Sequence, residues 1–87
     1  MDKRFEGKVA VITGGASGMG EATVLSFLRG GGKVVVADLN VEVNTFDAFG
    51  DAVLLHRTDV GDQAQVRALI EKAVSHFGRI DCLVNNA

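Results

Sequence analysis

The stretch that decides the fold is Val9-Ala10-Val11-Ile12-Thr13-Gly14-Gly15-Ala16-Ser17-Gly18-Met19-Gly20. It begins with a short apolar run that is typical of a buried strand, and a helix-like segment follows it to about Arg29. A glycine-rich turn between a strand and a helix presents bare backbone N–H groups at the positive end of the helix dipole. The stretch therefore predicts a binding site for a diphosphate.

Strand-like and helix-like segments alternate along the rest of the chain. Four apolar segments are expected to be strands: 8–13, 33–38, 52–57 and 79–84. Helices are expected over 19–29, over about 41–49, and from a cap at Asp62 to Phe77, where apolar side chains form one stripe. This alternation predicts βαβ units with right-handed crossovers. The fold class is therefore α/β, a doubly wound parallel sheet of Rossmann type whose elements run β-α-β-α-β-α-β.

The composition argues against several classes of protein. With 87 residues the chain forms at most one small domain, here a dinucleotide-binding segment over residues 1–87. Its net charge is −2 and it has no run of Lys or Arg, which disfavours nucleic acid as a partner. Its apolar runs are too short to span a membrane, and its first residues do not resemble a signal peptide. Cys82 is the single cysteine, so we expect a cytoplasmic protein with this side chain in the core.

The glycines of the turn have separate expected roles. Gly14 allows the tight turn, Gly18 lets the backbone approach a pyrophosphate, and Gly20 lets the helix pack close to the sheet. A nucleoside-triphosphate loop is the obvious alternative, since Gly15 and Gly20 have its spacing. That loop continues with Lys and Ser or Thr, whereas this chain continues with Glu21-Ala22. We therefore expect a dinucleotide rather than a triphosphate, and a merely flexible turn is the remaining alternative.

Asp38 ends the second expected strand, where its carboxylate can accept hydrogen bonds from both hydroxyls of an adenosine ribose. The same negative charge would repel the 2′-phosphate of NADP. Leu39 and Asn40 follow it, so no adjacent cation offsets this repulsion. The sequence thus favours NAD over NADP, the alternative being that Asp38 is an exposed turn residue.

Two further motifs follow the third and fourth expected strands. Asp59 is expected to accept a hydrogen bond from the adenine amino group while Val60 offers its backbone, although Asp59 also suits a turn before the cap at Asp62. Asn85-Asn86-Ala87 follows the last strand, where amides can bridge strand ends and the backbone can line a cofactor. The alternative is that Asn85 and Asn86 are simply residues of a turn. No residues have the spacing of a metal site.

Together, Thr13 to Gly20, Asp38, Asp59-Val60 and Asn85-Asn86-Ala87 resemble the motifs of the short-chain dehydrogenase/reductase family, in order and along the whole chain. The resemblance implies that Asp38 binds the adenosine ribose, that Asp59 and Val60 bind the adenine, and that Asn86 lies along the cofactor while Asn85 braces the sheet. It implies that the pyrophosphate and the nearby ribose are held by Gly14, Ser17, Gly18, Met19 and Gly20.

The chain departs from the family in one respect that concerns chemistry. Family members transfer a proton with a Tyr in a Tyr-x-x-x-Lys pair, and this sequence has no tyrosine. No residue here is therefore expected to be catalytic, and the chain resembles an incomplete domain that supplies cofactor binding only. The complete protein is expected to be a homo-oligomeric, NAD-dependent oxidoreductase acting on a secondary alcohol or ketone. A non-catalytic NAD-binding module and a fragment of an S-adenosylmethionine methyltransferase are the alternatives.

Overall fold

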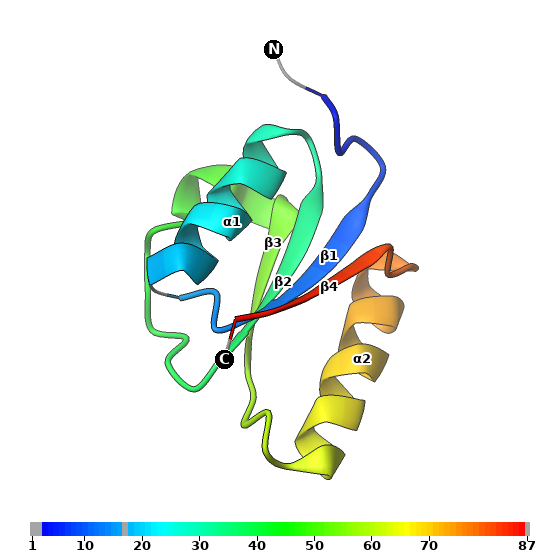
Figure 1. The fold of residues 1–87 in the computed structure, drawn as a ribbon. Coiled ribbons are helices and arrows are strands. Elements are labelled where there is room, and N and C mark those ends of the chain that lie inside the picture. The colour runs from blue at the N-terminus through cyan, green and yellow to red at the C-terminus, as the bar shows by residue number, and fades with distance from the viewer. Residues whose placement is uncertain (1–2, 17, 87) are drawn as a thin grey trace.

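The computed structural model describes residues 3–16 and 18–86, which form one parallel sheet with helices on both faces (Figure 1). The strands are β1 (Val9–Thr13), β2 (Lys33–Asp38), β3 (Val53–Arg57) and β4 (Cys82–Asn85). The helices are α1 (Gly18–Arg29), the 3-10 helix η1 (Asp47–Ala52) and α2 (Gln63–Phe77). Within the described part of the chain, no helix has the length and apolar character needed to cross a membrane.

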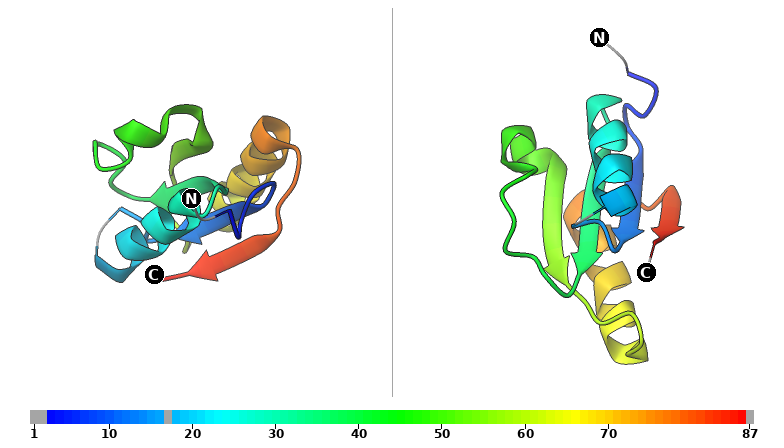
Figure 2. Two further views of the ribbon diagram at one scale, coloured as in Figure 1. Left: turned by 90° about the horizontal axis from the view of Figure 1, so that it is seen from above. Right: turned by 60° about the vertical axis from the view of Figure 1, so that its left-hand side comes forward.

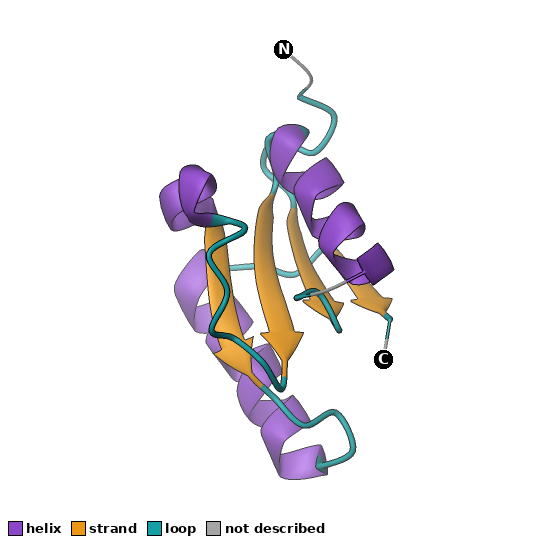
Figure 3. Cartoon of the chain, turned by 90° about the vertical axis from the view of Figure 1, so that its left-hand side faces the viewer, coloured by secondary structure: helices purple, strands orange, loops and turns teal. Residues whose placement is uncertain are grey.

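The strand order is β3-β2-β1-β4, and every neighbouring pair is parallel. The chain first runs outward from β1 to β2 and β3, then crosses back through α2 to place β4 on the other side of β1 (Figure 3). As a result, α1 and η1 cover one face of the sheet and α2 covers the other (Figure 2). This is the predicted doubly wound α/β fold, and ligands of such sheets bind beside the point where the order reverses, here between β1 and β4.

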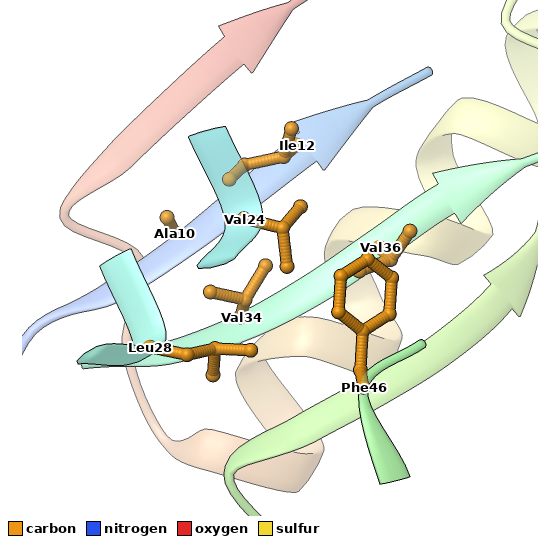
Figure 4. Close-up of a cluster of buried hydrophobic side chains, with 7 residues drawn as sticks. All are labelled: Ala10, Ile12, Val24, Leu28, Val34, Val36 and Phe46. Atoms are coloured by element: carbon orange, nitrogen blue, oxygen red, sulfur yellow. The ribbon is translucent and has the colours of Figure 1, made fainter. Parts of the chain in front are cut away.

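The core has one layer on each face of the two central strands. Side chains of β1 and β2 alternate between the layers, so both strands are buried along nearly their whole length. The layer under α1 contains Ala10, Ile12, Val24, Leu28, Val34, Val36 and Phe46 (Figure 4). The layer under α2 contains Val11, Val35, Ala37, Leu69 and Ala73. Two buried strands thus hold the glycine turn and Asp38 at one edge of a rigid sheet.

The segment between β2 and β3 differs from the expectation of a helix over about 41–49. The only helical turn there is η1, which starts later and is interrupted at Gly50, with φ 52° and ψ −124°. Upstream of it, side chains bind the backbone instead: Asn40 N donates to Asp38 Oδ1 and Glu42 N donates to Asn40 Oδ1. Such local bonds compete with helical ones. Phe46 still enters the core below α1.

The fourth strand also differs from the prediction. It starts at Cys82 rather than at residue 79, because the Asp81 side chain turns toward the start of β1 and accepts a hydrogen bond from Val9 N at 2.8 Å. The expectation that Cys82 is buried was wrong: it is exposed. Cys82 lies beside Ala10 on the α1 side of the sheet, but α1 covers β1 and β2 and does not extend over this edge strand. Leu83, on the other side, is 61% exposed.

Candidate functional site

The predicted site residues gather at the carboxyl edge of the sheet. A pocket of about 140 Å³ opens there between the end of β2, the glycine turn and the loop from β3 to α2. Its walls include four residues expected from the sequence, Gly14, Asp38, Asp59 and Val60. They also include Ala37, Leu39 and Thr58, which the sequence did not single out. Segments up to 46 residues apart along the chain, from Gly14 to Val60, thus form one concave surface.

The glycine turn is shaped by two different demands. Gly14 and Gly18 have positive φ values of 65° and 59°, a conformation that side chains disfavour. Gly20 has no such backbone requirement, but a Cβ on it would overlap the carbonyl oxygen of Gly14. The close packing that was expected between the helix and the sheet at Gly20 is instead packing of α1 against the turn, at Gly14 and Gly15. Ser17 lies outside the described residues.

The amino-terminal end of α1 is open to solvent. A Cβ on Gly18 would meet no atom within 4 Å, and Met19 is 83% exposed. This end carries backbone N–H groups that no helical carbonyl can satisfy, together with the positive end of the helix dipole. The helix end therefore offers hydrogen-bond donors beside an open position at Gly18, which suits a diphosphate. Met19 does not line the 140 Å³ pocket but a separate apolar hollow on the outer side of α1, beside Phe5 and Phe27.

Asp38 is half-buried at the end of β2, and its carboxylate contacts two backbone amides. Oδ2 accepts from Ala16 N and Oδ1 accepts from Asn40 N, both at 3.0 Å. The Asp38 carbonyl oxygen accepts from Thr58 N at 3.0 Å, which joins β2 to the next wall of the pocket. Since a carboxylate offers about four acceptor positions, Asp38 retains capacity for the two ribose hydroxyls.

The wall from β3 to α2 is built around Asp59. Its Oδ1 accepts from Gly61 N at 2.9 Å in a local turn, and its N–H donates to Gln65 Oε1 at 2.8 Å. Gln65 also donates to Asp62, the residue that caps α2. Gln65 stands three residues after the cap at Asp62, but its role in holding the Asp59 backbone is visible only in the fold. Val60 is 41% exposed at this wall.

Thr13 links β1 to the end of β4. Its Oγ1 donates to Asn85 Oδ1 at 2.8 Å, and Asn86 N donates to Thr13 Oγ1 at 3.2 Å. These contacts place Asn85 between the strands, in keeping with the expected bracing role. Asn86 is exposed at the same edge and does not line the 140 Å³ pocket. A second pocket of about 170 Å³ shares Val60 with the first one. Its other walls are Thr13, Asn85 and apolar side chains of α2 and β4, namely Val66, Leu69, Ile70 and Leu83.

The charge of the site is negative. Asp38 and Asp59 line the 140 Å³ pocket, and neither Lys nor Arg is among the described residues that form its walls. No group of three or more His, Cys, Asp or Glu side chains suited to a metal ion occurs in residues 3–16 and 18–86. The donors for an anion are thus backbone amides and the helix end, whereas the carboxylates are placed to accept from hydroxyl or amino groups.

Residues 8–87 match the family described as short chain dehydrogenase, and the chain belongs to this family. It is 44% identical over 88 residues to a (2S)-[(R)-hydroxy(phenyl)methyl]succinyl-CoA dehydrogenase subunit of Thauera aromatica, a match that covers 95% of this chain and 36% of that protein. It is 42% identical to a 3-oxoacyl-[acyl-carrier-protein] reductase of Thermotoga maritima, over 97% of this chain and 36% of that protein. The chain thus spans about a third of the length of these curated relatives.

Two solved structures have the same fold over the matched part. A 3-ketoacyl-(acyl-carrier-protein) reductase from Brucella melitensis complexed with NADH gives a TM-score of 0.83 at 43% identity, over 90% of this chain and 33% of that one. A short chain dehydrogenase/reductase from Burkholderia phymatum in complex with NAD gives 0.84 at 41% identity, over 92% and 30%. The family and the doubly wound fold expected from the sequence are confirmed.

Proposed function

We propose that residues 1–87 form the NAD-binding part of a short-chain oxidoreductase. The observation that carries this proposal is the 140 Å³ pocket, which joins the glycine turn at Gly14 to the carboxylate of Asp38. The diphosphate would lie against the turn and the end of α1 at Gly14, Ser17, Gly18, Met19 and Gly20. Asp38 would bind the adenosine ribose, and Asp59 and Val60 the adenine. Asn86 would lie farther along the cofactor, toward β4.

The charge at Asp38 supports NAD rather than NADP. A 2′-phosphate about 4 Å from this carboxylate would be repelled by about 4 kcal/mol per unit charge at an effective dielectric constant near 20. The described walls of the pocket carry no Lys or Arg to offset the repulsion. The two similar structures that contain NADH and NAD support the same choice.

In the complete protein, NAD would accept or donate a hydride, and the substrate would be a small molecule with a secondary alcohol or ketone. The role of the present residues is to bind and orient the cofactor: the turn and the end of α1 would donate hydrogen bonds to the diphosphate, and Asp38 would hold the adenosine end. None of them is assigned a proton transfer, since the sequence has no tyrosine. We therefore expect the 87-residue chain alone to be inactive.

We further propose that the domain continues beside β4. This strand is an edge of the sheet with apolar side chains exposed, which is an aggregation hazard unless something covers it. The relatives, about three times as long as this chain, have the residues to do so. The complete protein would be a cytoplasmic homo-oligomer that binds neither nucleic acid nor membranes.

Calorimetric titration of the protein encoded by the complete reading frame tests the cofactor assignment. NAD should bind at least about tenfold more tightly than NADP, a difference of about 1.4 kcal/mol. Asp38→Ala should reduce that preference, whereas Asp47→Ala, which removes the same charge from exposed η1, should leave it unchanged. Equal affinities, or an effect of both substitutions, would contradict the assignment.

The second candidate is a protein that binds NAD without turnover, since the residues assigned here bind the cofactor and none is assigned a catalytic role. The reading frame beyond Ala87 distinguishes the two. A Tyr and a Lys four residues apart, together with consumption of NAD in the presence of secondary alcohols, would support the oxidoreductase. Tight NAD binding without either would support the binding module. Membership of the short chain dehydrogenase family argues against the methyltransferase alternative, and tighter binding of S-adenosylmethionine than of NAD would reinstate it.

A further inference from the structure

The hydrogen bonds of Asp38 reach beyond the ribose that it is proposed to bind. Its Oδ2 accepts from the backbone of Ala16, a residue 22 positions earlier in the middle of the glycine turn. Ala16 is only 8% exposed, so water does not readily replace this bond. The other oxygen accepts from Asn40 N, just after β2. One carboxylate therefore joins the end of β2 to the turn that precedes α1.

A second bond holds the same turn to the same strand. Gly14 N donates to the carbonyl oxygen of Ala37 at 2.8 Å, next to Asp38. The first half of the turn is thus attached at two points to the last two residues of β2. The Gly14 bond is between backbone atoms, so a substitution of Asp38 does not remove it. The Ala16 bond depends on the side chain at position 38.

An asparagine at position 38 could not make both bonds. Its amide has one acceptor oxygen, and its NH₂ group would face the N–H of either Ala16 or Asn40, donor against donor. A bond from an amide to a carboxylate is also stronger than one to a neutral oxygen. The Asp38→Asn substitution should therefore release one of the two backbone amides while nearly preserving the size of the side chain.

We propose that Asp38 is a positioning residue for the diphosphate-binding turn as well as a ligand of the ribose. The carboxylate holds the Ala16 amide, and with it the amides of the turn, in the arrangement that a diphosphate meets. The ribose and diphosphate subsites are then coupled through one side chain. This inference rests on the proposed function, because it takes the adenosine diphosphate part of NAD to bind in this pocket.

Ligands with and without the ribose hydroxyls separate the two roles. ADP and 2′,3′-dideoxy-ADP would be titrated calorimetrically into the complete protein and its Asp38→Asn variant. If Asp38 holds the turn, the variant should bind the dideoxy analogue at least about tenfold more weakly, although that analogue has no hydroxyl for Asp38 to bind. Loss of the negative charge would by itself strengthen binding of a diphosphate, so a weakening cannot come from electrostatics. Unchanged or tighter binding of the analogue would overturn the proposal.

Hydrogen exchange of the ligand-free protein gives an independent readout. In Asp38→Asn the peptide that contains Ala16 should exchange faster. The peptide from α2 that contains Leu69 and Ala73 should exchange at the same rate as in the wild type, and this control would establish that the variant is folded. Asp59→Asn is the matched control: it removes the same charge from the same pocket, but Asp59 binds Gly61 and not the turn. Equal exchange of the turn in Asp38→Asn and the wild type would refute the proposal. Failure of the wild type to bind ADP would instead refute the proposed function.

Discussion

Gly18 offers a way to separate the folding role of the glycine turn from its ligand-binding role. Its φ of 59° is close to the left-handed helical conformation, and a Cβ there would meet no atom within 4 Å. Gly18→Ala should therefore lower the free energy of unfolding by only about 1–2 kcal/mol, the cost of holding a residue with a side chain in the left-handed conformation. Alanine also restricts the unfolded chain more than glycine does, and the lower entropy of the unfolded state offsets about 0.4–1 kcal/mol of this cost. The net loss of stability should be about 1 kcal/mol.

Gly7 provides the matched control for this substitution. Its φ is 79°, and a Cβ there also meets no atom within 4 Å, but it lies before β1 at the opposite end of the sheet from the pocket. Urea denaturation should show similar losses of stability for Gly7→Ala and Gly18→Ala. Only Gly18→Ala should weaken the binding of ADP, by about tenfold or more, because its methyl group enters the space in which the diphosphate approaches the turn. Equal affinities of the two variants would refute this account of the turn.

Three further predictions concern packing, pH and the edge of the sheet. Gly20→Ala should lower the free energy of unfolding by about 1–3 kcal/mol, because α1 must move away from the Gly14 carbonyl; denaturation in urea measures this, and a variant as stable as the wild type would exclude the close packing. The side-chain hydrogen bond from Arg79, followed by the backbone bond from Val9 N, holds the pKa of Asp81 below its ordinary value of 3.8. Asp81 therefore stabilises the fold above that value and loses its contribution as the pH falls through the lowered pKa. Asp81→Asn should be less stable than the wild type at neutral pH, with the gap closing in acid, and a gap independent of pH would contradict this. Residues 1–87 alone should associate and lack a cooperative thermal transition, since β4 is an exposed apolar edge; a monomer with a sharp calorimetric transition would disprove it.

The fold could be predicted from the sequence because its signals are local. The apolar strands, the glycine turn and the α2 cap at Asp62 all act within a few residues, and the structure has each of them. The segment before η1 could not be predicted in the same way. It is a polar stretch in which a short helix was expected, but the side-chain bonds of Asp38 and Asn40 to the following backbone favour turns.

The candidate site was predictable in outline rather than in detail. Asp38 and Asp59 were identified because each follows a strand, and parallel strands end at one edge of the sheet. The bond from Ala16 to Asp38 and that from Asp59 to Gln65 join residues through loops whose paths no local pattern specifies. The exposure of Cys82 was missed for a related reason: an apolar strand predicts burial, but only the fold shows how far a helix extends over it.

The exposed thiol of Cys82 makes this edge of the molecule experimentally observable. It is the single cysteine among the 87 residues, so within this chain a thiol-reactive label would attach at one known point on β4. Its rate of modification would then report whether neighbouring chain shields that strand. A side chain that was expected to lie in the core thus reports, through the reactivity of its thiol, whether β4 is covered.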